Sequence, residues 1–379
     1  MAPKRPYSAG AFPGPTGPNL VESTALNPIS AESQLYAALD LGTNSCRMLI
    51  AEPVGNQFKV IDSFSKSVQL GLGLEHSGRL SRASIHRTLQ ALRVCRQKLK
   101  RHKVGKMRLV ATEACRRASN GADFMERIKR ETGLTLDIIT PLEEAQLAVV
   151  SCAPLVSSGT DQLLVVDIGG GSTELVWIDL TRVAPEARAR AIMRMHLGFK
   201  SLEGDQSGAR VVDWISVPLG VATLRDQFND VEDDAARFAL MSWYFEENLA
   251  EFAPYKSEQV RDGFQIVGTS GTVTTVAASH LGLKRYDRNK VDGVTMTSDE
   301  IDTVIRRYLS LGEDGRRRDP RIGQDRQALI MSGSAILQAL LRCWPTDRLS
   351  VADRGLREGM LYAQMARDGV LGERKHGDA

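Results

Sequence analysis

The chain has 379 residues, 42% of them apolar, and a formal net charge of +3. This length allows two domains with substantial cores, and the composition is ordinary for a globular protein. No apolar run approaches the roughly 20 residues that span a bilayer, and so small a charge does not by itself indicate a nucleic-acid-binding protein. We therefore expect neither a membrane nor nucleic acid among the partners.

The two ends of the chain differ in composition from the rest. Residues 1–32 contain six prolines and three glycines, with few apolar residues between them. Such a stretch cannot bury a core, so we predict a disordered tail, and a second flexible tail at 369–379. The first tail also lacks the apolar centre of a secretory signal.

The cysteines indicate the compartment. There are five, they are scattered, and they form no C-x-x-C pair: Cys46, Cys95, Cys115, Cys152 and Cys343. This usage is typical of reduced thiols in the cytoplasm and argues against a disulfide framework or a zinc site. We expect a cytoplasmic protein.

The ordered part begins with a strand, a tight turn and a second strand over residues 36–52. The turn is Asp40-Leu41-Gly42-Thr43-Asn44-Ser45. A hairpin turn built from small residues lets a phosphate approach the backbone N–H groups closely. A third strand follows at 58–64, and then a glycine-rich loop at 71–74.

A long helix begins after its predicted N-cap, Ser81, and carries a basic face. The basic residues on this face are Arg82, Arg87, Arg93, Arg96, Lys98, Lys100, Arg101 and Lys103. Two interpretations remain open: a solvated helix face, or a cationic track for a long polyanion. No aromatic residues alternate with these charges, so base stacking is disfavoured.

The next segment holds two candidate functional residues. A short buried strand at 108–112 precedes a loop with Arg116, which is either a surface charge or an anion clamp. After a helix at 123–132 and a strand at 136–139, Pro141 opens another helix. Its first turn contains Glu143 and Glu144, where the helix dipole favours carboxylates.

The hairpin pattern then recurs. The strand at 163–166 leads into Asp167-Ile168-Gly169-Gly170-Gly171-Ser172-Thr173-Glu174, so that aspartate, glycine and serine repeat at an offset of 167 − 40 = 127 residues. An aspartate at the end of a strand can hold a hydrated divalent cation beside a phosphate. Two such hairpins a domain apart predict two related lobes that close on one phosphorylated substrate.

The rest of the chain completes an alternation of strands and helices. We predict strands at 214–217, 265–267 and 349–352, and helices at 184–195, 235–252, 273–281, 298–310, 328–342 and 356–367. The Gly268–Thr272 turn leads into a helix N-terminus, which favours an anion. Residues 312–318 are expected to form a charged loop in which Arg316, Arg317 and Arg318 are solvated. The alternation indicates an α/β protein with mixed sheets.

Several motifs together resemble one superfamily, that of sugar kinases, heat-shock chaperones and actin. Within it the chain is similar to the exopolyphosphatase / guanosine pentaphosphate phosphohydrolase family, in its short two-lobe form, from about Tyr36 to Arg367. The matching stretches are Asp40–Ser45, Ala111–Asn120, Pro141–Ala145, Asp167–Glu174, Gly268–Thr272 and Asp353–Gly359. One departure is Arg326-Gln327-Ala328, where an acidic residue often follows the arginine.

The resemblance implies a fold and a domain organisation. We expect two ribonuclease-H-like (actin-like) lobes with mixed, five-stranded-type sheets flanked by helices, and an active site in the interdomain cleft. The expected lobes are 33–140 and 141–355, and the closing helix at 356–368 is expected to pack back on the first lobe.

The resemblance also implies roles for individual residues. Glu144 matches the catalytic glutamate that activates water, and Arg116 matches an arginine that binds the terminal phosphate. The implied Mg²⁺ ligands are Asp40, Asp167 and Glu174. The implied phosphate-binding residues are Gly42, Thr43, Asn44, Ser45, Arg47, Gly169, Gly170, Gly171, Ser172, Thr173, Gly268, Thr269, Ser270 and Gly271.

We therefore expect a Mg²⁺-dependent exopolyphosphatase that releases orthophosphate from the ends of inorganic polyphosphate, with a monovalent cation as a second candidate activator. The alternative is hydrolysis of guanosine pentaphosphate by the same residues. Rivals of other classes are a kinase of the superfamily and an ATP-driven switch protein. Sequence leaves a homodimer open.

Overall fold

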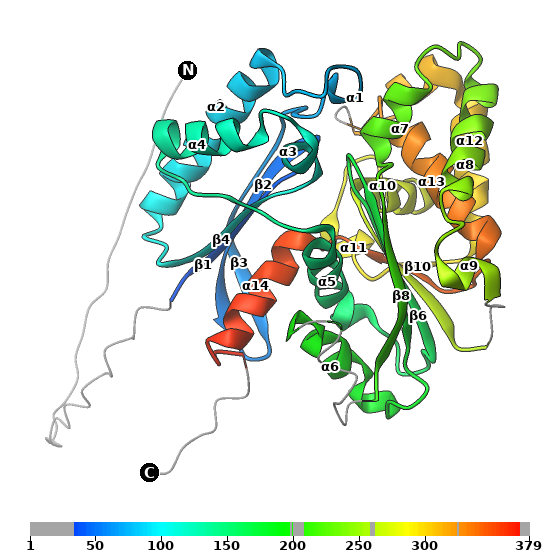
Figure 1. Cartoon of the computed structure of the whole chain (residues 1–379). Coiled ribbons are helices and arrows are strands. Elements are labelled where there is room, and N and C mark those ends of the chain that lie inside the picture. Colours follow the sequence, from blue (N-terminus) through cyan, green and yellow to red (C-terminus); the bar gives the residue numbers. More distant parts are fainter. Residues whose placement is uncertain (1–33, 198, 200–207, 258–261, 324–325, 372–379) are drawn as a thin grey trace, which may run out of the picture. The chain divides into compact units, whose positions relative to one another are not determined.

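The computed structural model describes residues 34–197, 199, 208–257, 262–323 and 326–371, in two mixed sheets flanked by helices (Figure 1). The predicted tail at 1–32, and residues 372–379 of the second tail, lie outside the described residues. The α/β class and the mixed sheets are confirmed.

The first sheet has the strand order β3-β2-β1-β4-β5. Its strands are β1 (Tyr36–Leu41), β2 (Ser45–Val54), β3 (Gln57–Ser67), β4 (Lys106–Ala111) and β5 (Asp137–Ile138). β1 pairs antiparallel with β2 and parallel with β4. Side chains alternate across β1, so Leu39 packs toward α2 (Arg82–Arg101) and α4 (Gly121–Thr132), whereas Ala38 packs toward α14 (Leu356–Arg367).

The second sheet has the order β10-β11-β9-β6-β7-β8. Its strands are β6 (Gln162–Ile168), β7 (Thr173–Asp179), β8 (Arg210–Val217), β9 (Phe264–Thr269), β10 (Thr295–Met296) and β11 (Leu349–Ala352). Helices α8, α10, α12 and α13 cover one face, and α5 and α6 cover the other. These helices are α5 (Pro141–Cys152), α6 (Arg188–Met193), α8 (Asp234–Glu247), α10 (Gly271–His280), α12 (Ser298–Arg318) and α13 (Ile330–Cys343).

The two sheets repeat one topology. The order β3-β2-β1-β4-β5 in the first sheet corresponds to β8-β7-β6-β9-β11 in the second. In both sheets, an antiparallel three-strand meander is followed by parallel strands. The repeat places the β1–β2 and β6–β7 hairpins at equivalent positions. The shorter helices are α1 (Leu74–Ser77), α3 (Glu113–Arg117), α7 (Val221–Gln227), α9 (Ala253–Ser257) and α11 (Arg288–Val291).

The prediction of a charged loop at 312–318 is wrong. Helix α12 continues to Arg318 past a break at Gly312, whose φ is 60°. The Arg316 guanidinium is buried. Its burial is compensated because it donates to Asp234 Oδ2 at 2.7 Å and to the Tyr308 carbonyl at 2.8 Å. Arg317 is exposed, as expected.

Two further observations bear on the class of protein. Within the described ranges, none of the helices combines the length and apolar character needed to cross a membrane. All five cysteines are free thiols, and four of them are buried.

Candidate active site

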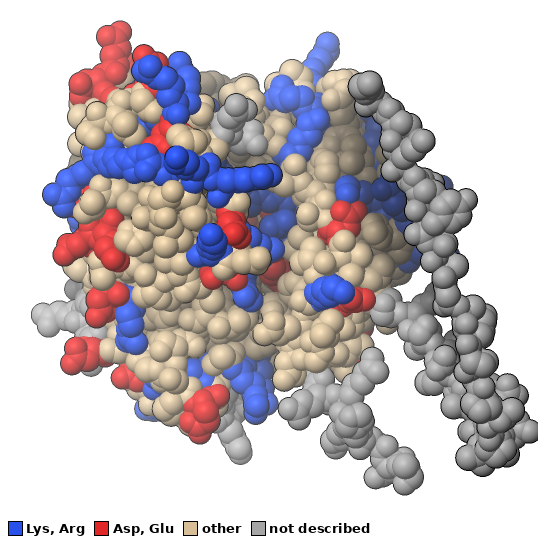
Figure 2. Space-filling model, turned by 180° about the vertical axis from the view of Figure 1, so that it is seen from behind, with Lys and Arg blue, Asp and Glu red and all other residues tan. Residues whose placement is uncertain are grey.

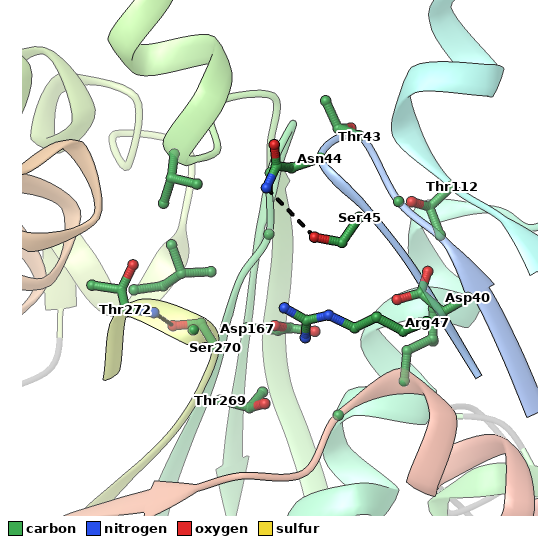
Figure 3. A pocket seen from close by; sticks show the side chains of 18 of the residues that line it. Asp40, Thr43, Asn44, Ser45, Arg47, Thr112, Asp167, Thr269, Ser270 and Thr272 are labelled. Atoms are coloured by element: carbon green, nitrogen blue, oxygen red, sulfur yellow. Dashed lines mark hydrogen bonds between the residues drawn. The ribbon is translucent and has the colours of Figure 1, made fainter. Parts of the chain in front are cut away.

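A pocket of about 150 Å³ lies between the tips of the two repeated hairpins (Figure 3). Most residues predicted for the site line it: Asp40, Gly42, Thr43, Asn44, Ser45, Arg47, Glu144, Asp167, Gly169, Gly170, Gly171, Ser172, Thr269, Ser270 and Gly271. Four of the predicted residues do not line it: Arg116, Thr173, Glu174 and Gly268. The pocket therefore brings together residues from both halves of the sequence.

The two hairpin turns have the same backbone geometry. Gly42 N donates to Ser45 O at 2.9 Å, and Gly169 N donates to Ser172 O at the same distance. The turns also touch each other, since a methyl group on Gly171 would lie 2.5 Å from Thr43 Oγ1. Glycine at this position thus permits the close approach of the two turns.

The turns that line the pocket contain unused backbone donors. The N–H groups of Thr43, Asn44, Gly170 and Gly171 donate to no acceptor in the described part of the chain. The opposite sides of the turns are held in place: Val68 N and Gln69 N donate to the Asn44 carbonyl, and the first N–H groups of α7 donate to the carbonyls of Gly169 and Gly170. Successive N–H groups that point into one cavity form an anion-binding nest.

The charges of the two hairpins differ. Asp40 lies opposite Arg47 in the β1–β2 register, and Figure 3 shows the Arg47 side chain extending toward Asp167. Asp167 lies opposite Glu174. Burial, with Glu144 and Asp40 nearby, raises the pKa of Asp167 to about 8. Burial and Asp167 raise the pKa of Glu174 to about 7.

Asp40 is better compensated than Asp167. Burial raises the pKa of Asp40, but the positive charges of Arg47 and Arg357 oppose this shift. Around Asp167, Arg47 is the cation that opposes the shift, and two carboxylates add to it. The region near Asp167 therefore has an excess of buried negative charge.

Glu144 is placed by the start of α5. Thr140 Oγ1 accepts from Glu143 N at 3.2 Å and Pro141 occupies the first turn, so this helix begins where predicted. Glu144 is 9% exposed, and burial together with Glu174 raises the pKa of its carboxyl well above the usual range, although Arg116 opposes the shift.

Arg116 is not a surface charge. It lies on α3 rather than in a loop, and its Nη1 donates to Glu144 Oε2 at 2.9 Å and to the Ile139 carbonyl at 2.7 Å. Its Nη2 donates to Glu113 Oε2 at 2.8 Å. The guanidinium thus orients Glu144 from behind the pocket.

The turn before α10 offers fewer donors than expected. Ser270 Oγ accepts from Thr272 N and from Val273 N, each at 3.0 Å, so this residue caps its own helix. Gly268 is buried within β9, behind the pocket, and Thr269 Oγ1 donates to the Arg354 carbonyl. The anion-binding role predicted for this turn remains a prediction.

A comparison with models of protein families assigns the chain to a family. The model of the Ppx/GppA phosphatase family matches residues 49–368. The chain belongs to the Ppx/GppA phosphatase family. The resemblance inferred from the motifs is thereby confirmed.

Individual members of the Ppx/GppA family agree with this assignment. The guanosine-5'-triphosphate,3'-diphosphate pyrophosphatase of Aeromonas salmonicida is 28% identical over 353 residues, which are 92% of this chain and 61% of that protein. The crystal structure of the Aquifex aeolicus Ppx/GppA family member is 29% identical, covers 88% of this chain and 98% of its own, and has a TM-score of 0.68.

A more distant Ppx/GppA structure supports the fold alone. The exopolyphosphatase from Cytophaga hutchinsonii is 22% identical, covers 89% of this chain and 100% of its own, and has a TM-score of 0.72. The predicted two-lobe fold is confirmed. The chain spans only 61% of the length of the curated relatives.

Sequence reasoning assigned no role to several residues that line the pocket. The main group is Asp353, Arg354, Gly355 and Arg357, which follow β11. Because Ala352 pairs with Thr269 in parallel register, the residues after both strands meet at one sheet edge. The available signal was a predicted strand at 349–352 followed directly by charged residues and a glycine.

The pocket has carboxylates suited to a magnesium ion, although no cluster of three metal-ligating side chains occurs among the residues described. Mg²⁺ in phosphate-handling sites typically uses one or two carboxylates, several waters and the substrate phosphates. Asp40 and Asp167 both line the pocket, and the Asp40 carboxylate contributes to the raised pKa of Asp167. The donor set therefore fits a hydrated Mg²⁺.

Proposed function

We propose that this pocket hydrolyses the terminal phosphoanhydride bond of a polyphosphorylated substrate and releases orthophosphate. The observation that carries the proposal is the placement of Glu144, an oriented carboxylate, at a pocket whose two walls present unused N–H donors. Figure 2 adds that Lys and Arg side chains gather around the hollow between the two halves, which favours a polyanion.

The hairpins would bind and orient the phosphoryl group. Phosphoryl transfer requires positioning and charge stabilisation more than covalent chemistry. The N–H groups of Thr43, Asn44, Gly170 and Gly171 would donate to the phosphate oxygens, and the Arg47 guanidinium would add a charged donor. These donors are fixed before substrate binds, because the loops behind them hold the turns.

Glu144 would act as the general base. Arg116 holds Oε2, so the other oxygen, Oε1, would accept the proton from the attacking water. The Arg116 charge also lowers the cost of ionising this buried carboxyl. Glu143 would have no such role, because it does not line the pocket and its carboxylate pairs with Arg108 at 2.9 Å.

Asp40 and Asp167 would hold Mg²⁺, with Glu174 adding negative charge from behind Asp167. When bound, the ion would neutralise charge on the phosphoryl oxygens. The raised pKa values of Asp167 and Glu174 support this assignment, since the same carboxylates would be compensated by a cation. Magnesium and its ligands remain proposals.

For the substrate, we place guanosine pentaphosphate ahead of inorganic polyphosphate, in contrast to the order expected from sequence. The support is that the curated relatives carry the name of guanosine-5'-triphosphate,3'-diphosphate pyrophosphatases. Polyphosphate stays the second candidate because basic side chains on α2, including Arg96 and Lys100, are exposed. Others are occupied: Lys98 pairs with Asp62, and Arg93 with Glu131.

The test is orthophosphate release from guanosine pentaphosphate and from long-chain polyphosphate, measured side by side with and without Mg²⁺. We expect turnover of the nucleotide at the higher kcat/KM, and no turnover by Glu144→Gln. Release from neither substrate by the wild type would contradict the proposed activity. A higher kcat/KM for polyphosphate would reverse the proposed order of substrates.

A further inference from the structure

A second pocket adjoins the first and has the same volume, about 150 Å³. We call it the side pocket. It shares Thr43, Asn44 and Leu329 with the first pocket, so the two cavities meet at the tip of the β1–β2 hairpin. Its far wall comes from α7 and includes Arg225 and Asp226. A ligand with its terminal phosphate in the first pocket would have this space beside it.

The lining of the side pocket does not suit a phosphate chain. Leu72 and Leu329 contribute apolar surface, and the side-chain amides of Asn44 and Gln69 contribute neutral donors and acceptors. Arg225 and Asp226 form an ion pair, so together they bring no net positive charge for a phosphate chain. Apolar side chains combined with several hydrogen-bonding groups suit a flat organic ring such as a nucleobase.

Asp226 is held in one orientation by its neighbour. Arg225 donates from Nε and from Nη2 to Asp226 Oδ1, at 3.1 and 2.7 Å. Oδ2 has no hydrogen-bond partner among the described residues. Because a carboxylate only accepts hydrogen bonds, the remaining oxygen selects a ligand edge that donates.

The junction of the two pockets contains an unsatisfied polar atom. The Thr43 side chain is only 6% exposed, and its Oγ1 has no hydrogen-bond partner within the described residues. A buried hydroxyl without a partner is costly. Thr43 lines both pockets, so this hydroxyl lies at their junction.

From these contacts we propose that the side pocket binds the base of the nucleotide substrate and that Asp226 selects guanine. The inference rests on the proposed function, because it places the terminal phosphate in the first pocket. Guanine presents two adjacent donors, N1–H and the 2-amino group, to a carboxylate. Adenine presents a lone pair at N1, which the Asp226 carboxylate would repel. Asp226 is therefore a specificity-determining residue of this site.

The first test uses Asp226→Asn and measures preferences between substrates. The variant should lower kcat/KM for guanosine pentaphosphate relative to tripolyphosphate, which has no base, by about 10- to 100-fold, the usual range for losing a charged hydrogen bond. It should also shift the preference from GTP toward xanthosine triphosphate, because xanthine has an acceptor at C2 to which the new amide can donate. Asp230→Asn, which removes the same charge at an exposed site outside the pocket, is the matched control.

The outcomes separate this inference from the proposed activity. If Asp226→Asn and Asp230→Asn both keep the wild-type preferences, the base-binding role is overturned. If the wild type hydrolyses nothing, the proposed activity fails, and binding of a fluorescent GDP analogue decides the inference. Binding weakened about tenfold or more by Asp226→Asn alone would support the side pocket. Equal binding by all three proteins would overturn it.

Discussion

The β1–β2 and β6–β7 hairpins share a backbone but differ in charge. Each turn is closed by the same N–H···O=C bond of 2.9 Å and has N–H groups without an acceptor among the described residues. Across the strands, however, Asp40 faces Arg47, whereas Asp167 faces Glu174. The comparison teaches that a duplicated fold can keep one backbone geometry while a single cross-strand position changes the local charge. In the proposed mechanism both turns would donate to phosphate, and Asp167 would contribute more than Asp40 to holding the cation.

The largest expected effect lies outside both hairpins. If the hairpins only bind and position, removing the base should stop the chemistry without removing the substrate. Glu144→Gln should reduce kcat by about 1000-fold, since general-base catalysis contributes on that order, and should change the substrate Kd little. Steady-state kinetics and equilibrium binding check this.

Glu143→Gln is the matched control for the base, because Glu143 is the preceding residue and pairs with Arg108 away from the pocket. It should retain activity within a few fold. Equal losses in the two variants would mean that the effect arises from the α5 helix rather than from Glu144.

Substitution of Asp40 and of Asp167, which occupy equivalent positions in the two hairpins, should affect Mg²⁺ dependence unequally. Asp167→Asn should raise the Mg²⁺ concentration for half-maximal activity by about 10- to 100-fold, in line with the usual cost of disturbing a metal site. Asp40→Asn should raise it less, since Arg47 already compensates that hairpin. The measurement is a Mg²⁺ titration of initial rates. A larger shift for Asp40→Asn would reverse the assignment of the hairpins.

The two hairpin aspartates should also differ in how they make the free energy of unfolding depend on pH. The pKa of Asp167 is raised to about 8 in the folded protein, against about 3.9 when unfolded. The folded protein therefore binds more protons across this window. The contribution of Asp167 to the free energy of unfolding is fully present below about pH 4 and is lost as the pH rises toward about 8. Metal-free Asp167→Asn should lose less stability than the wild type between pH 5 and pH 8, as measured by thermal denaturation.

Asp40→Asn serves as the comparison in the stability experiment, and we expect a smaller change because Arg47 and Arg357 oppose the pKa shift of Asp40. Identical pH profiles for the wild type and Asp167→Asn would show that this carboxyl is not the source of the pH dependence.

The smallest effect concerns the corresponding glycines. A methyl group on Gly169 would lie 2.8 Å from the Ser172 carbonyl oxygen, whereas one on Gly42 would lie at an ordinary 3.6 Å from the Ser45 carbonyl oxygen. Gly169→Ala should therefore lower the free energy of unfolding by about 1–3 kcal/mol, as overpacking does. Gly42→Ala should change it by less. Urea denaturation distinguishes the two, and equal losses would contradict this difference in space.

Local patterns predicted much of the fold and half of the site. The hairpins and the start of α5 could be predicted because their signals lie within a few residues, such as the small residues of each turn and Pro141. Glu144 gained its role from the resemblance, and the structure places it at the pocket. These features depend on short-range geometry.

Long-range pairing explains what was missed. Arg357 reaches the pocket because β11 pairs with β9, more than 80 residues earlier in the chain. Arg316 is buried in an ion pair with Asp234, which lies 82 residues earlier in the chain. Arg116 likewise contacts Glu144 across 28 residues. No local pattern encodes such contacts, so the sequence alone predicts a solvated run at Arg316–Arg318 and a loop position for Arg116.

The most direct test of the proposed metal and phosphate sites is a crystal grown with phosphate and with Mn²⁺ as a substitute for Mg²⁺. The metal would be located by anomalous scattering. The account predicts one manganese peak in contact with the Asp167 carboxylate, and a phosphate on the N–H groups of the β1–β2 and β6–β7 turns. A manganese ion bound away from Asp167, or a phosphate outside this pocket, would contradict it.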